Sequence, residues 1–221
     1  MEMTKEINEI EQSEIDVQRK AKKALLWFGL VSIVMLFAGL TSAYLVRQGE
    51  GKWVEFSIPS TFAISTLLIV ISSVSMQWAL VSIKKGNTAN FKKALLITLF
   101  LGIGFAVSQY VAWTELYQKG IVFTGRVSDI KTNFNYIPSG KETVEQAADV
   151  GNVAGSFLYV ITGLHVLHLI AGIFSLIFVF SRATRNKYSA ENYNGVSICA
   201  IYWHFLDGLW VYLFFFLLYI R

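Results

Sequence analysis

Five long apolar runs, separated by polar connections, organise this chain. They cover residues 24–46, 58–83, 94–114, 153–181 and 196–220. The hydrocarbon core of a bilayer is about 30 Å thick and needs roughly 20 apolar helical residues to cross it. Because a helix satisfies its own backbone hydrogen bonds in lipid, helices are the structures expected to span. The pattern predicts an all-α integral membrane bundle of five transmembrane helices, forming a single membrane domain over residues 1–221.

Lysine and arginine gather in three places, which predict the orientation. These clusters fall within residues 19–23, 84–93 and 182–187, before the first run, after the second and after the fourth. In a five-span chain those three segments share one side of the membrane. The positive-inside rule makes that side the cytoplasm. We therefore expect a cytoplasmic amino-terminal tail over 1–23, a carboxyl terminus outside, and outer connections at 47–57 and 115–152.

The composition agrees with a membrane protein and narrows the remaining choices. Hydrophobic residues make up 54% and charged residues 15% of the chain, with a mean hydropathy of +0.50. The formal charge of +4 is explained by topology, so no nucleic-acid partner is expected. A lone cysteine, Cys199, excludes a disulfide or cysteine metal site within the chain and suggests a packing role.

The amino-terminal segment and the long outer loop are the least regular parts of the predicted topology. The charged start of the chain is unlike a secretory signal, so we expect no cleavage. Residues 1–18 carry acids and isoleucines spaced to form a short amphipathic helix, and a solvated tail fits equally well. The outer loop 115–152 contains glycine, asparagine and proline typical of a surface loop.

Polar residues inside the last two runs are the candidate functional residues. A carboxylate in mid-span costs on the order of 2.5–3.5 kcal/mol on insertion scales, so Asp207 requires a partner. His204 is three residues away on the same helix face and is the expected partner. Trp203, Asp207 and Trp210 form a stripe at helical spacing, which gives this helix one polar and aromatic side.

His165 and His168 repeat the three-residue spacing on the fourth run. Helix-rise estimates place His168, Asp207 and His204 at depths that allow a polar cluster between the two helices. Three roles are open for the histidines: interhelical hydrogen bonding, haem or metal ligation, and a proton relay. Ligation of one haem requires matched depths, and His165 and His204 differ by roughly 12 Å along the helices.

Weaker candidates lie on the other runs. Gln109 could cross-link helices, as could Gln77 and the serines at 72, 73 and 75. Trp113 marks a span end and fits an aromatic belt. Small residues at Gly102, Gly104, Gly29 and Gly39, and at Gly163 and Gly172, predict close helix packing.

Two motifs carry a family resemblance. Residues 162–168 read TGLHVLH after the GSF at 155–157, and residues 202–210 read YWHFLDGLW. In this order, on the last two helices, they resemble the signatures of subunit III of haem–copper oxidases. Leu101, Gly102, Gln109 and Trp113 resemble that family's corresponding helix, and 36–40 with Ala43 and Tyr44 is similar to the first helix of its five-helix bacterial form.

The resemblance implies a non-catalytic subunit of a cytochrome c or quinol oxidase. Such a chain binds no haem or copper, because these lie in partner subunits. It packs on subunit I, belongs to a complex that also contains subunit II, holds phospholipid, and supports proton uptake and complex stability. The resemblance thereby makes Thr162, His165, His168, Trp203, His204, Asp207 and Trp210 a structural, lipid or subunit-interface cluster, with Gln109 and Trp113 secondary.

Departures from the family pattern limit what can be carried over. Ile33 and Ala112 stand where members often have glutamate, which leaves Asp207 as the acidic group at depth. The two extra amino-terminal helices of longer members have no counterpart, so a lipid cleft would take a wall from another subunit.

Two other functions compete with this interpretation. One is a haem b membrane anchor ligated by His165 or His168 with His204. The other is a small ion transporter using Asp207, although no broken-helix pair supports it.

Overall fold

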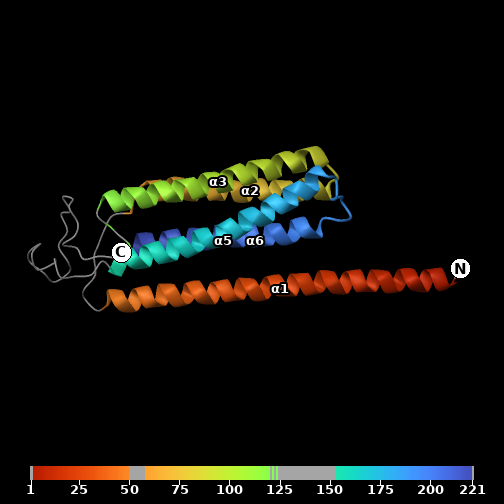
Figure 1. Ribbon diagram of the computed structural model, residues 1–221, viewed down its shortest axis with the longest axis horizontal. Helices are drawn as coiled ribbons and strands as arrows, with labels where there is room; N and C mark the ends of the chain where they lie inside the picture. The colour runs from red at the N-terminus through yellow and green to blue at the C-terminus, as the bar shows by residue number, and fades with distance from the viewer. Residues whose placement is uncertain (1, 50–57, 120, 122, 124–152, 221) are drawn as a thin grey trace, which may run out of the picture.

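Five helices make up the described part of the molecule. The computed structural model describes residues 2–49, 58–119, 121, 123 and 153–220, excluding the side chains of 2–12, 15 and 16. The helices are α1 (Glu2–Gln48), α2 (Thr61–Lys84), α3 (Thr88–Gln118), α5 (Val153–Thr184) and α6 (Asn194–Tyr219) (Figure 1). All five are long and apolar enough to cross a membrane. The predicted all-α, five-span membrane fold is confirmed.

Helix boundaries differ from the predicted runs in two instructive ways. Helix α1 runs without interruption from Glu2, so residues 2–23 of the predicted tail are helical and continuous with the first span. Helix α3 continues to Gln118 and takes in the start of the predicted outer loop. Apolarity marks where lipid begins and ends, whereas a helix continues for as long as its backbone bonds do. Residues 50–57, 120, 122 and 124–152 of the two outer connections lie outside the described residues.

The helices form two layers with α1 outermost. Figure 1 shows α2 beside α3, α5 beside α6, and α1 along the side away from α2 and α3. Helix α6 is the most enclosed. In the most apolar 18-residue stretch of each helix, 44% is buried in α6 and 17% in α1. Side chains of α6 therefore meet several helices at once, and α1 leaves most of its apolar surface uncovered.

All three basic clusters lie at one end of the bundle, where α1 extends past the α2–α3 and α5–α6 connections (Figure 1). Gly86 turns the first connection with φ +75°, and Asn87 accepts a hydrogen bond from the Asn90 amide to cap α3. The Lys92 ammonium of α3 donates to Asn186 Oδ1 at 2.9 Å and ties α3 to the α5–α6 connection. The predicted shared side is observed, and its assignment to the cytoplasm remains a prediction.

Tyr188 anchors the α5–α6 connection. Its ring meets Phe91 edge-on at 6.2 Å, and the Arg182 guanidinium lies 5.8 Å from its centroid. Burial raises the pKa of the Tyr188 hydroxyl, which keeps that group neutral. This connection is thereby fixed to the start of α3 and the end of α5.

Candidate functional site

The polar and aromatic stripe of α6 faces the interior, as its spacing predicts. Trp203 and Trp210 are fully buried and Asp207 is 3% exposed. Residues at i, i+4 and i+7 share one helix face, and here that face is the one enclosed by α2, α3 and α5. The stripe is confirmed as the core-facing side of the helix.

Trp203 lies in a slot between two glycines. A Cβ built on Gly102 of α3 would stand 2.7 Å from Trp203 Cη2, and one on Gly172 of α5 would stand 3.4 Å from Trp203 Cε3. The indole Nε1 donates to Ser72 Oγ of α2 at 3.0 Å. The packing role predicted for Gly102 and Gly172 is confirmed. Gly29, Gly39 and Gly163 do not pack against another described helix of this chain, because no described atom lies within 4 Å of a Cβ added at any of them.

Trp210 joins α6 to three helices. Its Nε1 donates to Thr66 Oγ1 of α2 at 3.0 Å, and its ring meets Phe105 of α3 edge-on at 4.9 Å. The His165 ring of α5 lies 5.0 Å from the Trp210 ring and 5.9 Å from Phe105. His165 is fully buried, and neither ring nitrogen has a hydrogen-bond partner among the described residues. In this chain the His165 imidazole packs as an aromatic ring.

His204 and Asp207 turn toward α2. A hydrogen bond of 2.7 Å joins His204 Nδ1 to Ser73 Oγ. The Ser73 hydroxyl also lies near the Asp207 carboxyl, but neither carboxyl oxygen completes a hydrogen bond within the described residues. The expected His204–Asp207 pair is therefore wrong. The Ser73 hydroxyl across the helix contact bonds the imidazole instead.

His168 lies on another side of α5, toward α1. Its Nδ1 lies 2.7 Å from the Leu164 carbonyl oxygen, and because a carbonyl can only accept, Nδ1 carries the hydrogen. The ring meets Phe37 of α1 edge-on at 5.9 Å, and the Tyr202 hydroxyl donates to the His168 carbonyl at 3.1 Å. The histidines thus serve three different helix contacts, and they form no common polar cluster.

The secondary candidates cross-link neighbouring helices. Gln109 Nε2 donates to Ser65 Oγ of α2 at 2.7 Å, and Ser75 Oγ donates to the Ala94 carbonyl of α3 at 3.0 Å. Trp113 Nε1 donates to Thr162 Oγ1 at 3.1 Å, which ties α3 to α5. The interhelical role predicted for Gln109 is confirmed. Trp113 was expected only to mark the membrane interface, and it also bonds to a neighbouring helix.

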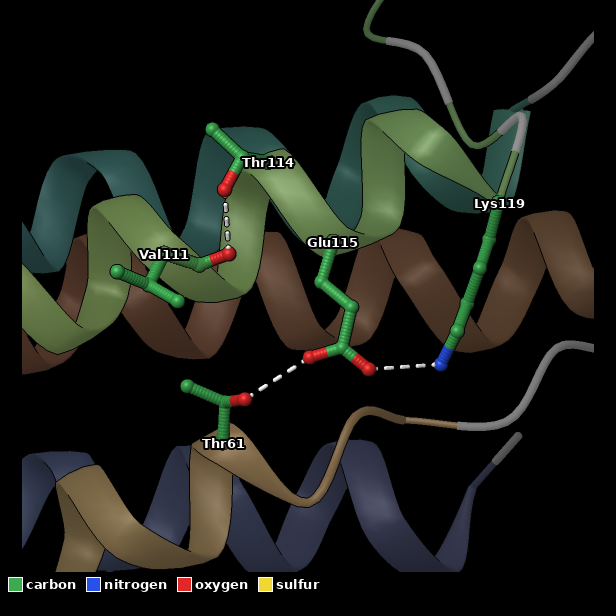
Figure 2. Close-up of polar contacts among 5 residues, drawn as sticks. All are labelled: Thr61, Val111, Thr114, Glu115 and Lys119. Carbon is green, nitrogen blue, oxygen red and sulfur yellow. Dashed lines mark hydrogen bonds and ion pairs between the residues drawn. The ribbon is translucent and has the colours of Figure 1, made fainter.

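A second polar contact, at the opposite end from the basic clusters, was not expected from the sequence. Glu115 near the end of α3 accepts hydrogen bonds from Thr61 Oγ1 and Lys119 Nζ, each at 2.9 Å (Figure 2). Thr61 is the first residue of α2, whose first turn contains no acid and whose N-cap Ser60 makes no side-chain cap. The Glu115 carboxylate therefore complements the positive end of that helix. In the sequence, the Glu-x-x-x-Lys spacing of Glu115 and Lys119 could have predicted their ion pair.

Tyr159 is a further residue that sequence reasoning missed. Its hydroxyl donates to the Ile121 carbonyl at 2.8 Å, and the Trp113 carbonyl, at 3.3 Å, is a second acceptor for the same hydrogen. The bond fastens the segment after α3 to α5. A tyrosine in an apolar run gives no sequence signal of such a long-range bond.

These contacts favour helix cross-linking over ligation or transport. Within the described residues no three His, Cys, Asp or Glu side chains come together in a group suited to a metal. His165 contacts Phe105 and Trp210, and His204 is bonded to Ser73, so the two histidines do not oppose each other across a shared space. The geometry gives no support to the haem-anchor alternative.

Comparison with known proteins settles the family. The family model described as cytochrome c oxidase subunit III matches residues 134–221. A cytochrome c oxidase subunit 3 of Thermostichus vulcanus is 32% identical over 84% of this chain and 80% of its own length. The chain belongs to the cytochrome c oxidase subunit III family. A probable cytochrome c oxidase subunit 3 of Mycobacterium leprae is 27% identical over 87% of the chain and 84% of its own length.

Membership of the subunit III family establishes the broad role. The chain is a subunit of a respiratory oxidase, which is a multisubunit complex. It is a multi-pass protein of the bacterial cytoplasmic membrane.

A cytochrome c oxidase subunit 3 of Loxodonta africana is 30% identical over 68% of this chain but only 47% of its own length. At Ala112, where the family pattern often has glutamate, the side chain is fully buried in the core.

Proposed function

We propose that this chain is the non-catalytic subunit III that packs on subunit I of a haem–copper terminal oxidase, in a complex that also contains subunit II. It holds phospholipid and supports proton uptake and the durability of the complex, while haems and copper reside in partner subunits. The observation that carries the proposal is that residues of the family motifs hold the helices of this chain together. Trp203, Trp210, His204 and Thr162 all bond to neighbouring helices.

The uncovered surface supports a role inside a larger assembly. Large apolar side chains along α1 are exposed, among them Trp27, Phe28 and Met35 at 59%, 74% and 69%. Lipid or a neighbouring subunit must cover such a surface.

Co-purification tests the main proposal. The affinity-tagged chain is extracted from native membranes in mild detergent, separated on a native gel, and its partners are identified by mass spectrometry. We expect a haem- and copper-containing subunit I, and no haem absorption in the isolated chain. Failure to co-purify with any oxidase subunit would refute the proposal, and an α band in the reduced-minus-oxidised spectrum of the isolated chain would favour a haem anchor.

Substitutions at Asp207 and His204 test the assembly role. Asp207→Ala and His204→Ala are expected to lower the yield of complex more than they change the oxidase spectrum. His204→Ala leaves the Ser73 hydroxyl without its imidazole partner, at a cost of about 1–3 kcal/mol. Asp207→Ala leaves a space beside the same hydroxyl where the carboxyl lay. Asp207→Asn is the matched control, because it keeps the size of the side chain and a polar head group. Full assembly of Asp207→Ala would show that the carboxyl is dispensable for docking.

A further inference from the structure

A basic cavity opens at the end of the bundle where the three cationic clusters meet. It has a volume of about 570 Å³. Its charged lining comprises Arg19, Lys20 and Lys23 of α1, Lys84 of α2, and Glu191 of the α5–α6 connection. A neighbouring cavity of about 470 Å³ shares Arg19 and Glu191 and adds Lys22 and Arg182. We infer that the larger cavity is a binding site for a phosphate-bearing anion.

Charge is the first reason. Among the described side chains, four basic residues from two helices border one space, and Glu191 is the acid in its lining. Like charges that share a partly enclosed space repel one another, and an anion placed among them removes that cost. Topology explains why lysine and arginine lie on this side of the membrane. It does not explain why α1 and α2 direct them toward the same cavity.

The uncharged part of the lining suits an anion as well. Tyr193, Asn194 and Ser197 come from the amino terminus of α6, whose first turn contains no acid. The N-cap residue Tyr193 gives this helix no side-chain cap, and the amino terminus of a helix is the end that favours an anion. The Lys84 ammonium is held 5.7 Å over the Tyr193 ring, at the edge of the same space. Cationic side chains beside the amino terminus of a helix are surroundings that a phosphate group favours.

Depth in the membrane identifies the sources of such an anion. Lys23 directly precedes the first apolar run and Lys84 directly follows the second, so the cavity lies at the level where hydrocarbon gives way to headgroups. The phosphate of an anionic phospholipid reaches this level from the bilayer. Inorganic phosphate or a soluble phosphate ester reaches it from water. The recognised chemistry is the same, and the experiment separates the two sources.

The test compares two double variants of the full-length chain in non-ionic detergent micelles. Lys20→Gln/Lys84→Gln removes two charges from the cavity. Lys85→Gln/Lys93→Gln removes two charges from the same end, at residues that line neither cavity. One arm measures retention of phosphatidylglycerol against phosphatidylcholine by native mass spectrometry. The other measures binding of radiolabelled inorganic phosphate by equilibrium dialysis. Helicity by circular dichroism checks that each variant is folded.

The cavity variant is expected to lose at least about tenfold in affinity for one of the two probes, with the control double unchanged. Loss of phosphatidylglycerol supports a lipid source, and loss of phosphate binding supports a soluble one. Lys20→Arg/Lys84→Arg keeps both charges and is expected to retain binding. Equal behaviour of the cavity and control doubles toward both probes would overturn the inference. Because the site lies within this chain, the result does not depend on docking to subunit I.

Discussion

The close approach of Trp203 to Gly102 makes a sharp prediction about the core. In Gly102→Ala the new Cβ would stand 2.7 Å from Trp203 Cη2 and 2.9 Å from Cζ2. The indole would have to retreat by about 0.7 Å to reach 3.4 Å, where ordinary van der Waals contact begins. Its movement is limited, because Gly172 of α5 also lies against the ring and the bond to Ser72 holds its Nε1.

The expected cost follows from two opposed terms. Overpacking a well-filled core costs about 1–3 kcal/mol. Replacing a helical glycine by alanine recovers roughly 0.5–1 kcal/mol of backbone entropy. Gly104→Ala is the matched control, since it lies on the same helix and its Cβ would meet only Leu68 Cδ1, at 4.0 Å. The entropy term cancels between the two variants, so Gly102→Ala should be less stable than Gly104→Ala by about 1–3 kcal/mol.

Unfolding in mixed detergent micelles, followed by tryptophan fluorescence, measures this difference. The near-ultraviolet circular dichroism of Gly102→Ala is also expected to change, because it reports the packing of buried indoles. Equal unfolding midpoints for the two alanine variants would refute the reasoning. Such a result would mean that Trp203 has freedom that its contacts with Gly172 and Ser72 deny it.

Two further contacts give measurable expectations. Trp113→Phe and Thr162→Val each remove the bond between α3 and α5, and a double-mutant cycle of unfolding free energies should give a coupling of about 0.6 kcal/mol, the average for such bonds in membranes. Additive effects would show that the bond contributes nothing. Glu115→Gln should destabilise by no more than about 1 kcal/mol, because its pair with Lys119 is partly exposed, and the loss should shrink in high salt. A salt-independent loss would assign the effect to the Thr61 bond instead.

The comparison of sequence and structure is clearest in the last two helices. The i, i+4, i+7 spacing of Trp203, Asp207 and Trp210 identified one face of α6, and that face is buried. Which residues of other helices meet that face was not readable. Gly102, Ser72 and Thr66 lie more than 100 positions away in the chain, and no local spacing connects them to the indoles.

The expected pairing of His204 with Asp207 failed for the same reason. Helical spacing shows which side chains share a face, but a polar group on a facing helix competes for the same hydrogen bond. In this chain His204 bonds to Ser73 of the facing helix α2. Likewise, His165 and His168 are three residues apart, yet one meets Trp210 and the other Phe37.

The sequence by itself determined the membrane class, the five spans and the shared side of the basic clusters, because lipid imposes a length and a polarity on each segment that can be read locally. Its motifs also predicted the family. Tertiary structure alone decided that Trp203 fills a slot between two glycines, that the histidines separate to three helix contacts, and that basic residues of α1 and α2 border one cavity. These outcomes depend on the rotation and crossing of whole helices, which packing sets after each helix has formed.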